Sequence, residues 1–176
     1  MAVVGLGSNG VLLGILAREA GAEVLIGSDP DPGRRRHAGR LGFDRVIDPS
    51  EDLTRTAAEM TAGRGADAVF VLPTVEEAFE AAVAAAAPAG RVVFYSPIEP
   101  GKVWRLLPHG AYLRDLTLRF CYSCGPREIR TAIAAIERGV VKAESVVTHR
   151  VPLERAPEAF RLALSRGDVL KVVVTM

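Results

Sequence analysis

Val3-Val4-Gly5-Leu6-Gly7-Ser8-Asn9-Gly10-Val11 is the stretch of sequence that decides the fold. A short β-branched run meets three glycines spaced as G-x-G-x-x-G, and an apolar segment suited to a helix follows them. In a dinucleotide site the first glycine permits the tight turn, the second lets the backbone approach a pyrophosphate, and the third lets the helix pack on the strand. The N-terminus of that helix presents free N–H groups to the phosphates. The predicted cofactor-binding residues of this loop are Gly5, Gly7, Ser8, Asn9 and Gly10.

An acidic residue stands at the distance that such a site requires. Residues 23–28 are typical of a second strand, and Asp29 follows it, nineteen residues past Gly10. A carboxylate there accepts hydrogen bonds from the adenosine ribose and would repel a 2′-phosphate, which favours NAD over NADP. The arginines at 34–36, with the serine before Asp29, could instead neutralise such a phosphate, or they could form a solvated helix face. We expect NAD, with Asp29 and Arg34 as binding residues.

The bulk composition excludes several classes of protein. The 176 residues are 49% hydrophobic and 24% charged, with a formal net charge of +1, enough for one ordinary domain with a core. So neutral a chain has no long-range attraction to nucleic acid or to an anionic membrane. Two cysteines make no disulfide framework, and no signal peptide or membrane-length apolar run is found. By this absence of signals we expect a cytoplasmic protein.

Strand-like and helix-like segments alternate along most of the chain. Strands are expected at 2–4, 23–27, 45–47, 66–72, 91–95 and 116–120, and helices at 10–20, 34–41, 52–61, 75–87 and 126–138. Thr74 is the predicted cap of the alanine-rich helix that follows it. This alternation predicts an α/β Rossmann fold, a doubly wound and mostly parallel six-stranded sheet with helices on both faces.

The last part of the chain does not fit that sheet. Residues 145–151, 156–165 and 169–175 are typical of a strand, a helix and a further strand. We therefore predict a dinucleotide-binding domain at 1–140 and a C-terminal β-α-β appendage at 141–176.

Several stretches together resemble the cofactor domain and C-terminal segment of the medium-chain, zinc-type alcohol and polyol dehydrogenases. These are the glycine motif, Asp29 with 34–38, Leu41-Gly42-Phe43-Asp44-Arg45-Val46-Ile47, 65–69, 90–93, Thr148-His149-Arg150-Val151-Pro152-Leu153-Glu154, 158–160 and 171–173. The resemblance covers nearly the whole chain, and 148–154 with the two segments after it is its most specific part.

The resemblance implies roles for residues at the ends of the strands. The family lines the nicotinamide half of its cofactor site with loops at these positions, largely through the backbone, although ordinary strand-end turns would place residues there too. The corresponding residues of this chain are Pro73, Thr74, Ser96, Phe120 and Cys121. Lys171 is similar to a basic residue of the last strand that reaches the pyrophosphate, and a surface lysine is the alternative.

The chain departs from the family in lacking what precedes the cofactor motif. In the family a separate catalytic domain stands there and holds the catalytic zinc through Cys, His and Glu side chains. This sequence is therefore either cut at the domain boundary or the product of a gene that lost the domain, and 141–176 would complete that missing domain. We assign no catalytic and no metal-binding residue to this chain. Cys121 and Cys124 lack a second ligand pair for zinc and are interpreted as a chance C-x-x-C, with a redox pair as the alternative.

The resemblance implies the NAD-binding portion of a dehydrogenase that moves hydride between NAD and a small alcohol or polyol. We expect this portion to be inactive alone. The alternatives are a free-standing dinucleotide-binding sensor without catalysis and a complete small reductase. We also expect a homodimer along the sheet edge around 103–120, with Trp104 buried against the partner, although Trp104 could pack within its own subunit.

Overall fold

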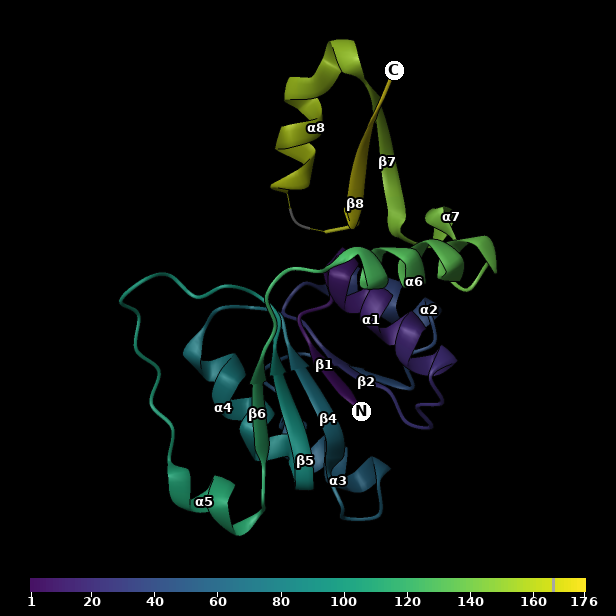
Figure 1. The fold of residues 1–176 in the computed structure, drawn as a ribbon. Helices are drawn as coiled ribbons and strands as arrows, with labels where there is room; N and C mark the ends of the chain where they lie inside the picture. Colours follow the sequence, from purple (N-terminus) through teal and green to yellow (C-terminus); the bar gives the residue numbers. More distant parts are fainter. Residues whose placement is uncertain (166) are drawn as a thin grey trace.

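Strand β1 (Ala2–Val4) lies at the centre of a six-stranded sheet with the order β3-β2-β1-β4-β5-β6. The computed structural model describes residues 1–165 and 167–176. The other strands of this sheet are β2 (Ile26–Ser28), β3 (Arg45–Ile47), β4 (Ala66–Val71), β5 (Ala86–Phe94) and β6 (Thr117–Phe120). Every neighbouring pair is parallel (Figure 1). From β1 the chain adds β2 and β3 on one side and β4, β5 and β6 on the other. This reversal beside β1 confirms the predicted doubly wound fold.

Helices connect the strands and cover both faces of the sheet. They are α1 (Ser8–Glu19), α2 (Pro32–Arg40), α3 (Leu53–Met60) and α4 (Glu76–Ala85). Two further helices, α5 (Pro108–Leu113) before β6 and α6 (Pro126–Glu137) after it, bury at most one residue each. Successive residues of β1 point to opposite faces, because side chains alternate along a strand. Ala2 and Val4 join one core cluster with residues of α3 and α4, whereas Val3 joins a second cluster with residues of α1 and α2. No helix of the described residues is long and apolar enough to cross a membrane.

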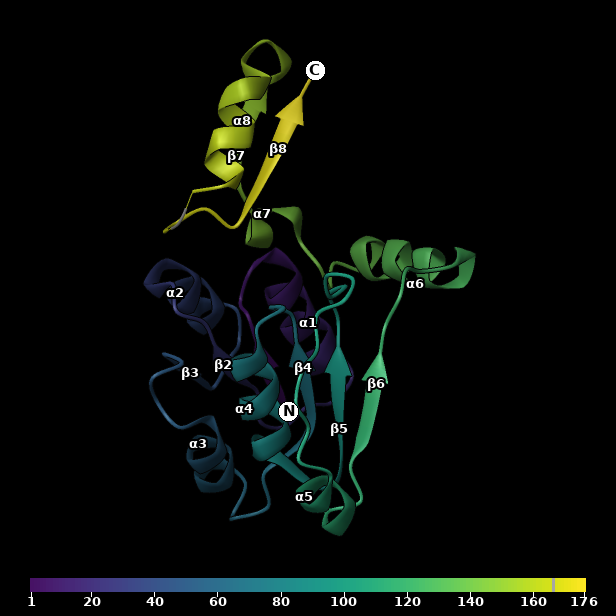
Figure 2. The ribbon, with the colours of Figure 1, turned by 90° about the vertical axis from the view of Figure 1, so that its left-hand side faces the viewer.

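The C-terminal part forms a small unit of its own beyond the carboxyl ends of the strands (Figures 1 and 2). It consists of α7 (Ala143–Val146), β7 (Val147–Pro152), the 3₁₀ turn Leu153–Arg155, α8 (Ala156–Ala163) and β8 (Lys171–Thr175). Strands β7 and β8 pair in parallel, so the predicted β-α-β appendage is confirmed. Val146 and Leu170 are buried in the same cluster as Val3, which seats the unit on the α1 side of the sheet. The domain boundary at residue 140 stays a prediction.

The alanine-rich segment divides between two elements where the sequence predicts one helix. Helix α4 ends at Ala85, and residues 86–90 belong to β5. The Arg114 guanidinium donates hydrogen bonds to the carbonyls of Val83, Ala84 and Ala86 at 3.0–3.1 Å, and so satisfies the end of the helix from outside. Ala86 pairs with Ala66 of β4. These tertiary contacts override the high helix propensity of alanine.

Other boundaries moved by smaller amounts. Val75, not Thr74, is the N-cap residue of α4 and makes no side-chain capping bond, so the capping role predicted for Thr74 is wrong. Helix α5 lies partly in a region that the sequence predicts as loop, and α7 replaces the start of a predicted strand. Both are short helices that lack a strong periodic pattern.

Strand β6 forms one edge of the sheet, as predicted, but Trp104 does not extend from that edge. Its indole stacks on Phe79 with 5.3 Å between ring centroids and lies 5.9 Å from the ring of Phe94. The predicted burial of Trp104 against a partner is therefore wrong, because this ring completes the aromatic cluster of its own chain. In the segment that leads into β6, Val103 (80%) and Leu107 (85%) are left exposed.

The Arg114 cap provides a test of the fold. We expect Arg114→Met to lower the free energy of unfolding by about 1–3 kcal/mol, because it leaves carbonyls at the end of α4 without donors. Urea denaturation would measure the change. Arg55→Met is the control, since Arg55 forms an exposed i,i+4 ion pair with Glu59, a kind worth well under about 1 kcal/mol. Equal losses in the two variants would contradict the capping role.

Candidate functional site

A cavity of about 900 Å³ opens at the carboxyl ends of β1, β2 and β4. Such a position, beside the point where strand order reverses, is where open α/β sheets bind ligands. Eight predicted residues line it: Gly5, Gly7, Ser8, Asn9, Asp29, Arg34, Pro73 and Ser96. The structure thus gathers most of the predicted site into one place.

The three glycines of the loop stand in three different environments. Gly5 has φ = +92°, a conformation that side chains disfavour. A Cβ at Gly10 would lie 1.9 Å from the carbonyl oxygen of Gly5, so only glycine lets α1 approach the loop. A Cβ at Gly7 would meet nothing within 4 Å. Gly7 is therefore the glycine that the described fold does not itself require.

The N-terminus of α1 points its backbone donors at the cavity. Gly7 is the N-cap residue, and it supplies no side chain that could bond the first N–H groups. The first turn of α1 carries no acidic residue that would compete for them. The loop and helix therefore form an open site for an anion, and the helix dipole favours negative charge there.

Asp29 is fixed by backbone donors on two sides. Its side chain is nearly buried, Oδ2 accepts from the Leu6 N–H at 2.7 Å, and Oδ1 accepts from the Asp31 N–H at 2.8 Å. An ionised carboxylate offers about four lone-pair sites. Acceptor capacity therefore remains on both oxygens at the edge of the cavity.

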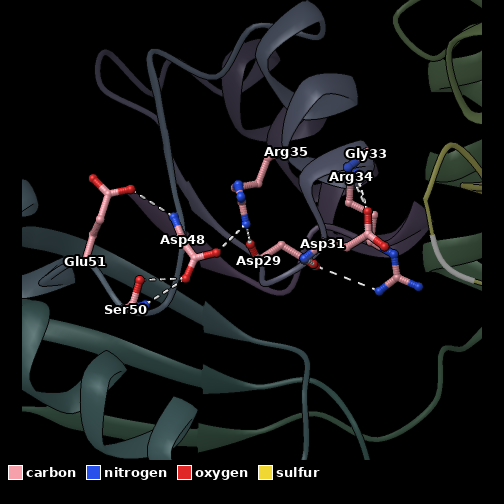
Figure 3. Close-up of polar contacts among 8 residues, drawn as sticks. All are labelled: Asp29, Asp31, Gly33, Arg34, Arg35, Asp48, Ser50 and Glu51. Carbon is pink, nitrogen blue, oxygen red and sulfur yellow. Dashed lines mark hydrogen bonds and ion pairs between the residues drawn. The ribbon is translucent and has the colours of Figure 1, made fainter.

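The three neighbouring arginines have three different partners, and Figure 3 shows those of Arg34 and Arg35. Arg34 lines the cavity with its Nη1 3.8 Å from Oδ2 of Asp29. Arg35 donates to the Asp29 carbonyl and to Oδ2 of Asp48, each at 2.7 Å, and so ties the ends of β2 and β3 together. Arg36 pairs with Asp168 of the C-terminal unit at 2.8 Å. Arg34 alone of the three contributes its charge to the cavity.

Asp31 caps α2 and also reaches the C-terminal unit. Oδ1 accepts from the N–H groups of Gly33 (2.7 Å) and Arg34 (3.1 Å), and Oδ2 accepts from the Gly167 N–H at 2.7 Å. Burial raises the pKa of this carboxyl, but the hydrogen bonds from Gly167, Arg34 and Gly33 outweigh burial, so the pKa lies below its ordinary value.

A second, smaller cavity of about 390 Å³ adjoins the first along Tyr95 and Ser96. Phe120 and Cys121 line this cavity and not the larger one. The Ser96 hydroxyl donates to the Leu72 carbonyl at 2.6 Å, which fixes the wall between the two. Four of the predicted strand-end residues, Pro73, Ser96, Phe120 and Cys121, therefore divide between two adjoining cavities.

Three predicted residues do not line either cavity. Gly10 is buried beneath the loop, Thr74 offers its carbonyl to the Lys102 ammonium at 3.1 Å, and Lys171 is exposed at the start of β8. Both cysteines are free and exposed. Among residues 1–165 and 167–176 no group of three His, Cys, Asp or Glu side chains is placed to hold a metal ion.

Sequence reasoning missed one wall of the larger cavity. The turn after β3 contributes Pro49, Ser50 and Glu51, and the first turns of α4 contribute Ala78 and Ala81. The rule that ligands bind at the carboxyl ends of strands, applied to β3 as well, would have found the turn. The alanines gave no comparable indication, because small residues on a helix face normally indicate close packing.

Comparison with known proteins identifies relatives of this arrangement. The family model for zinc-binding dehydrogenases matches residues 9–138. The L-threonine 3-dehydrogenase of Pyrococcus horikoshii is 29% identical over 177 residues, which cover 97% of this chain and 49% of that protein.

Solved structures show the same similarity. A zinc-binding dehydrogenase from Sinorhizobium meliloti, bound to NADP, superposes on this chain with a TM-score of 0.88 at 27% identity. The superposition covers 99% of this chain and 52% of the Sinorhizobium chain. The 2R,3R-butanediol dehydrogenase of Bacillus subtilis gives a TM-score of 0.91 at 25% identity, with 99% and 50% covered. The chain therefore spans about half the length of the relatives that it matches.

The depressed pKa of Asp31 predicts a pH dependence of stability. A carboxyl whose pKa is lower in the folded chain stabilises the fold fully above its unfolded pKa of about 4, and this contribution disappears as the pH falls through the lower folded value. We expect the stability difference between the wild type and Asp31→Asn, measured by urea denaturation, to be largest at neutral pH and to shrink below about pH 4. A difference that stays constant down to pH 3 would contradict this assignment.

Proposed function

Since the chain belongs to the zinc-binding dehydrogenase family, we propose that it is the NAD-binding part of an enzyme that transfers hydride between NAD and a small alcohol or polyol. Gly7 carries this proposal. The described fold leaves open space where its Cβ would stand, at the N-terminus of a helix that faces a cavity of about 900 Å³. A glycine is needed there if a ligand occupies that space.

Each part of the cofactor has residues suited to it in this proposal. The loop Gly5–Gly10 and the first N–H groups of α1 bind the pyrophosphate. Asp29 accepts hydrogen bonds from the adenosine ribose, and the nicotinamide lies toward the smaller cavity beside Ser96, Phe120 and Cys121. Bound NAD supplies the group that accepts or gives hydride, while the protein orients it.

The preference for NAD over NADP depends on the charges near Asp29. A 2′-phosphate would approach a carboxylate that is buried and held in place by two backbone N–H groups. The Arg35 and Arg36 guanidinium groups bond to other partners, so Arg34 is the one of the three that lines the cavity. One observation speaks against a preference for NAD: the Sinorhizobium relative is bound to NADP.

The C-terminal unit is proposed to contact a catalytic half that lies outside this chain. Its helix α8 exposes Phe160 (72%), and Leu164 beside it is exposed to 86%. Large apolar side chains exposed together favour an interaction surface. Zinc would be held by that other half, because the described residues offer no donor set for it. This chain alone is then expected to be inactive. The alternative function, a dinucleotide-binding sensor without catalysis, would need no catalytic half.

We expect Gly7→Val to weaken NAD binding at least about tenfold, because the new side chain fills the space proposed for the pyrophosphate. Calorimetric titration would measure the affinity. Gly39→Val is the matched control, since a Cβ at Gly39 also meets nothing within 4 Å but lies on α2 outside the cavity lining. Unchanged binding in Gly7→Val would overturn the proposed function. Tighter binding of NADP than of NAD by the wild type would overturn the cofactor preference.

We also propose a homodimer along the β6 edge, through the region Val103–Phe120. Val103, Leu107 and Tyr112, in the segment that leads into β6, are each at least 80% exposed, and β6 has one unpaired edge. We expect the wild type to sediment as a dimer and Val103→Glu as a monomer. Ile136→Glu is the control, because Ile136 is 59% exposed on α6, a different surface. Dissociation by Ile136→Glu alone would assign the contact to α6 instead.

A further inference from the structure

Gly167 and Asp168, which precede β8, lie against the start of α2. Gly167 donates its N–H to Asp31, 136 positions away in the sequence, at 2.7 Å. The two backbones are so close that a Cβ on Gly33 would lie 2.4 Å from the Gly167 carbonyl group. The C-terminal unit therefore touches the turn that carries Asp29.

Capping of α2 does not by itself require an aspartate at position 31. Asp52, the N-cap residue of α3, bonds the Thr54 and Arg55 N–H groups with Oδ1 alone. Asp31 likewise bonds the first turn of its helix with Oδ1 alone. Asparagine and serine cap helices about as well as aspartate. The second oxygen of Asp31 is thus free for a different purpose, and it accepts from Gly167.

The hydrogen bonds continue from Asp31 to the glycine loop. The Asp31 N–H donates to Oδ1 of Asp29 at 2.8 Å, and Oδ2 of Asp29 accepts from the Leu6 N–H at 2.7 Å. Asp29 and Asp31 are both buried, with 2% and 8% of their surface exposed. A displacement of the Asp31 backbone would therefore move the Asp29 carboxylate.

We propose that Asp31 is a positioning residue, which holds the Asp29 carboxylate in place to bind the ribose. The affinity of Asp29 for the ribose then depends on the contact between Asp31 and the C-terminal unit. This inference rests on the proposed function. Leu170 supports the coupling from the other side of the contact, because it is buried in one cluster with Leu6 of the glycine loop. The unit that faces the catalytic half is thereby bonded to the part of the site that binds adenosine.

Two substitutions separate the hydrogen bond between Asp31 and Gly167 from the capping of α2 by Asp31. Asp31→Asn keeps one oxygen for the helix but replaces the other by an amide donor, which cannot accept from Gly167. Gly33→Ala leaves Asp31 intact and favours the helix, but its Cβ displaces the Gly167 backbone. Gly39→Ala is the matched control on the same helix, because its Cβ meets nothing within 4 Å.

The measurement is the affinity of each variant for NAD and for NAD that lacks the adenosine 2′-hydroxyl. We expect Asp31→Asn and Gly33→Ala each to weaken NAD binding about five- to tenfold, the scale of one ordinary hydrogen bond, because Asp29 is displaced and not removed. Binding of the deoxy analogue should weaken by a smaller factor than binding of NAD, because it lacks one of the hydroxyls that Asp29 binds. The double variant should bind no more weakly than the weaker single variant, since both break one contact.

The outcomes distinguish this inference from the proposed function. If the wild type binds no NAD, or if Gly7→Val binds as well as the wild type, the proposed function fails. If Gly7→Val loses binding while Asp31→Asn and Gly33→Ala bind NAD as Gly39→Ala does, the positioning role alone is overturned. Equal losses for NAD and its deoxy analogue would also overturn it, because a general loss of structure does not distinguish the two ligands.

Discussion

The close approach of Gly10 to the carbonyl oxygen of Gly5 is the constraint on which the site depends. With only 1.9 Å available to a Cβ, any side chain at position 10 would push α1 off the loop. The approach sets the first turn of α1 over the end of β1, so that its N–H groups face the cavity. It also holds the loop where the Leu6 N–H reaches Asp29. The absence of a Cβ at Gly10 thus lets β1, α1 and the Asp29 side chain take their positions around the cavity.

The sequence predicted the parts of this arrangement that are local. The glycine spacing, the apolar periods and the position of Asp29 all lie within short stretches, and the structure places each as predicted. The boundary at Ala85 could not be predicted in this way, because the side chain that ends α4 is Arg114, far along the chain. Trp104 was misplaced for a related reason: its ring partners, Phe79 and Phe94, belong to other elements.

The candidate site shows the same division. Gly7 and Asp29 were predicted from spacing alone, because the proposed dinucleotide site would require residues of these types at that spacing. Ser50 and Glu51 carry no such spacing, and they line the cavity because β3 lies beside β2. The second role of Asp31 was the least predictable feature, since its partner is a backbone N–H group and backbone groups leave no trace in residue identity.

The contact between Asp31 and Gly167 has a consequence for how the chain folds. It spans 136 positions, so forming it closes a loop that contains most of the 176 residues. Loop closure of this size must be offset by contacts that form with it, here the burial of Val146 and Leu170. Gly167 follows all six strands of the central sheet in the sequence, so it is synthesised after them. The turn that carries Asp29 therefore reaches its final geometry only after every strand of the central sheet has been made.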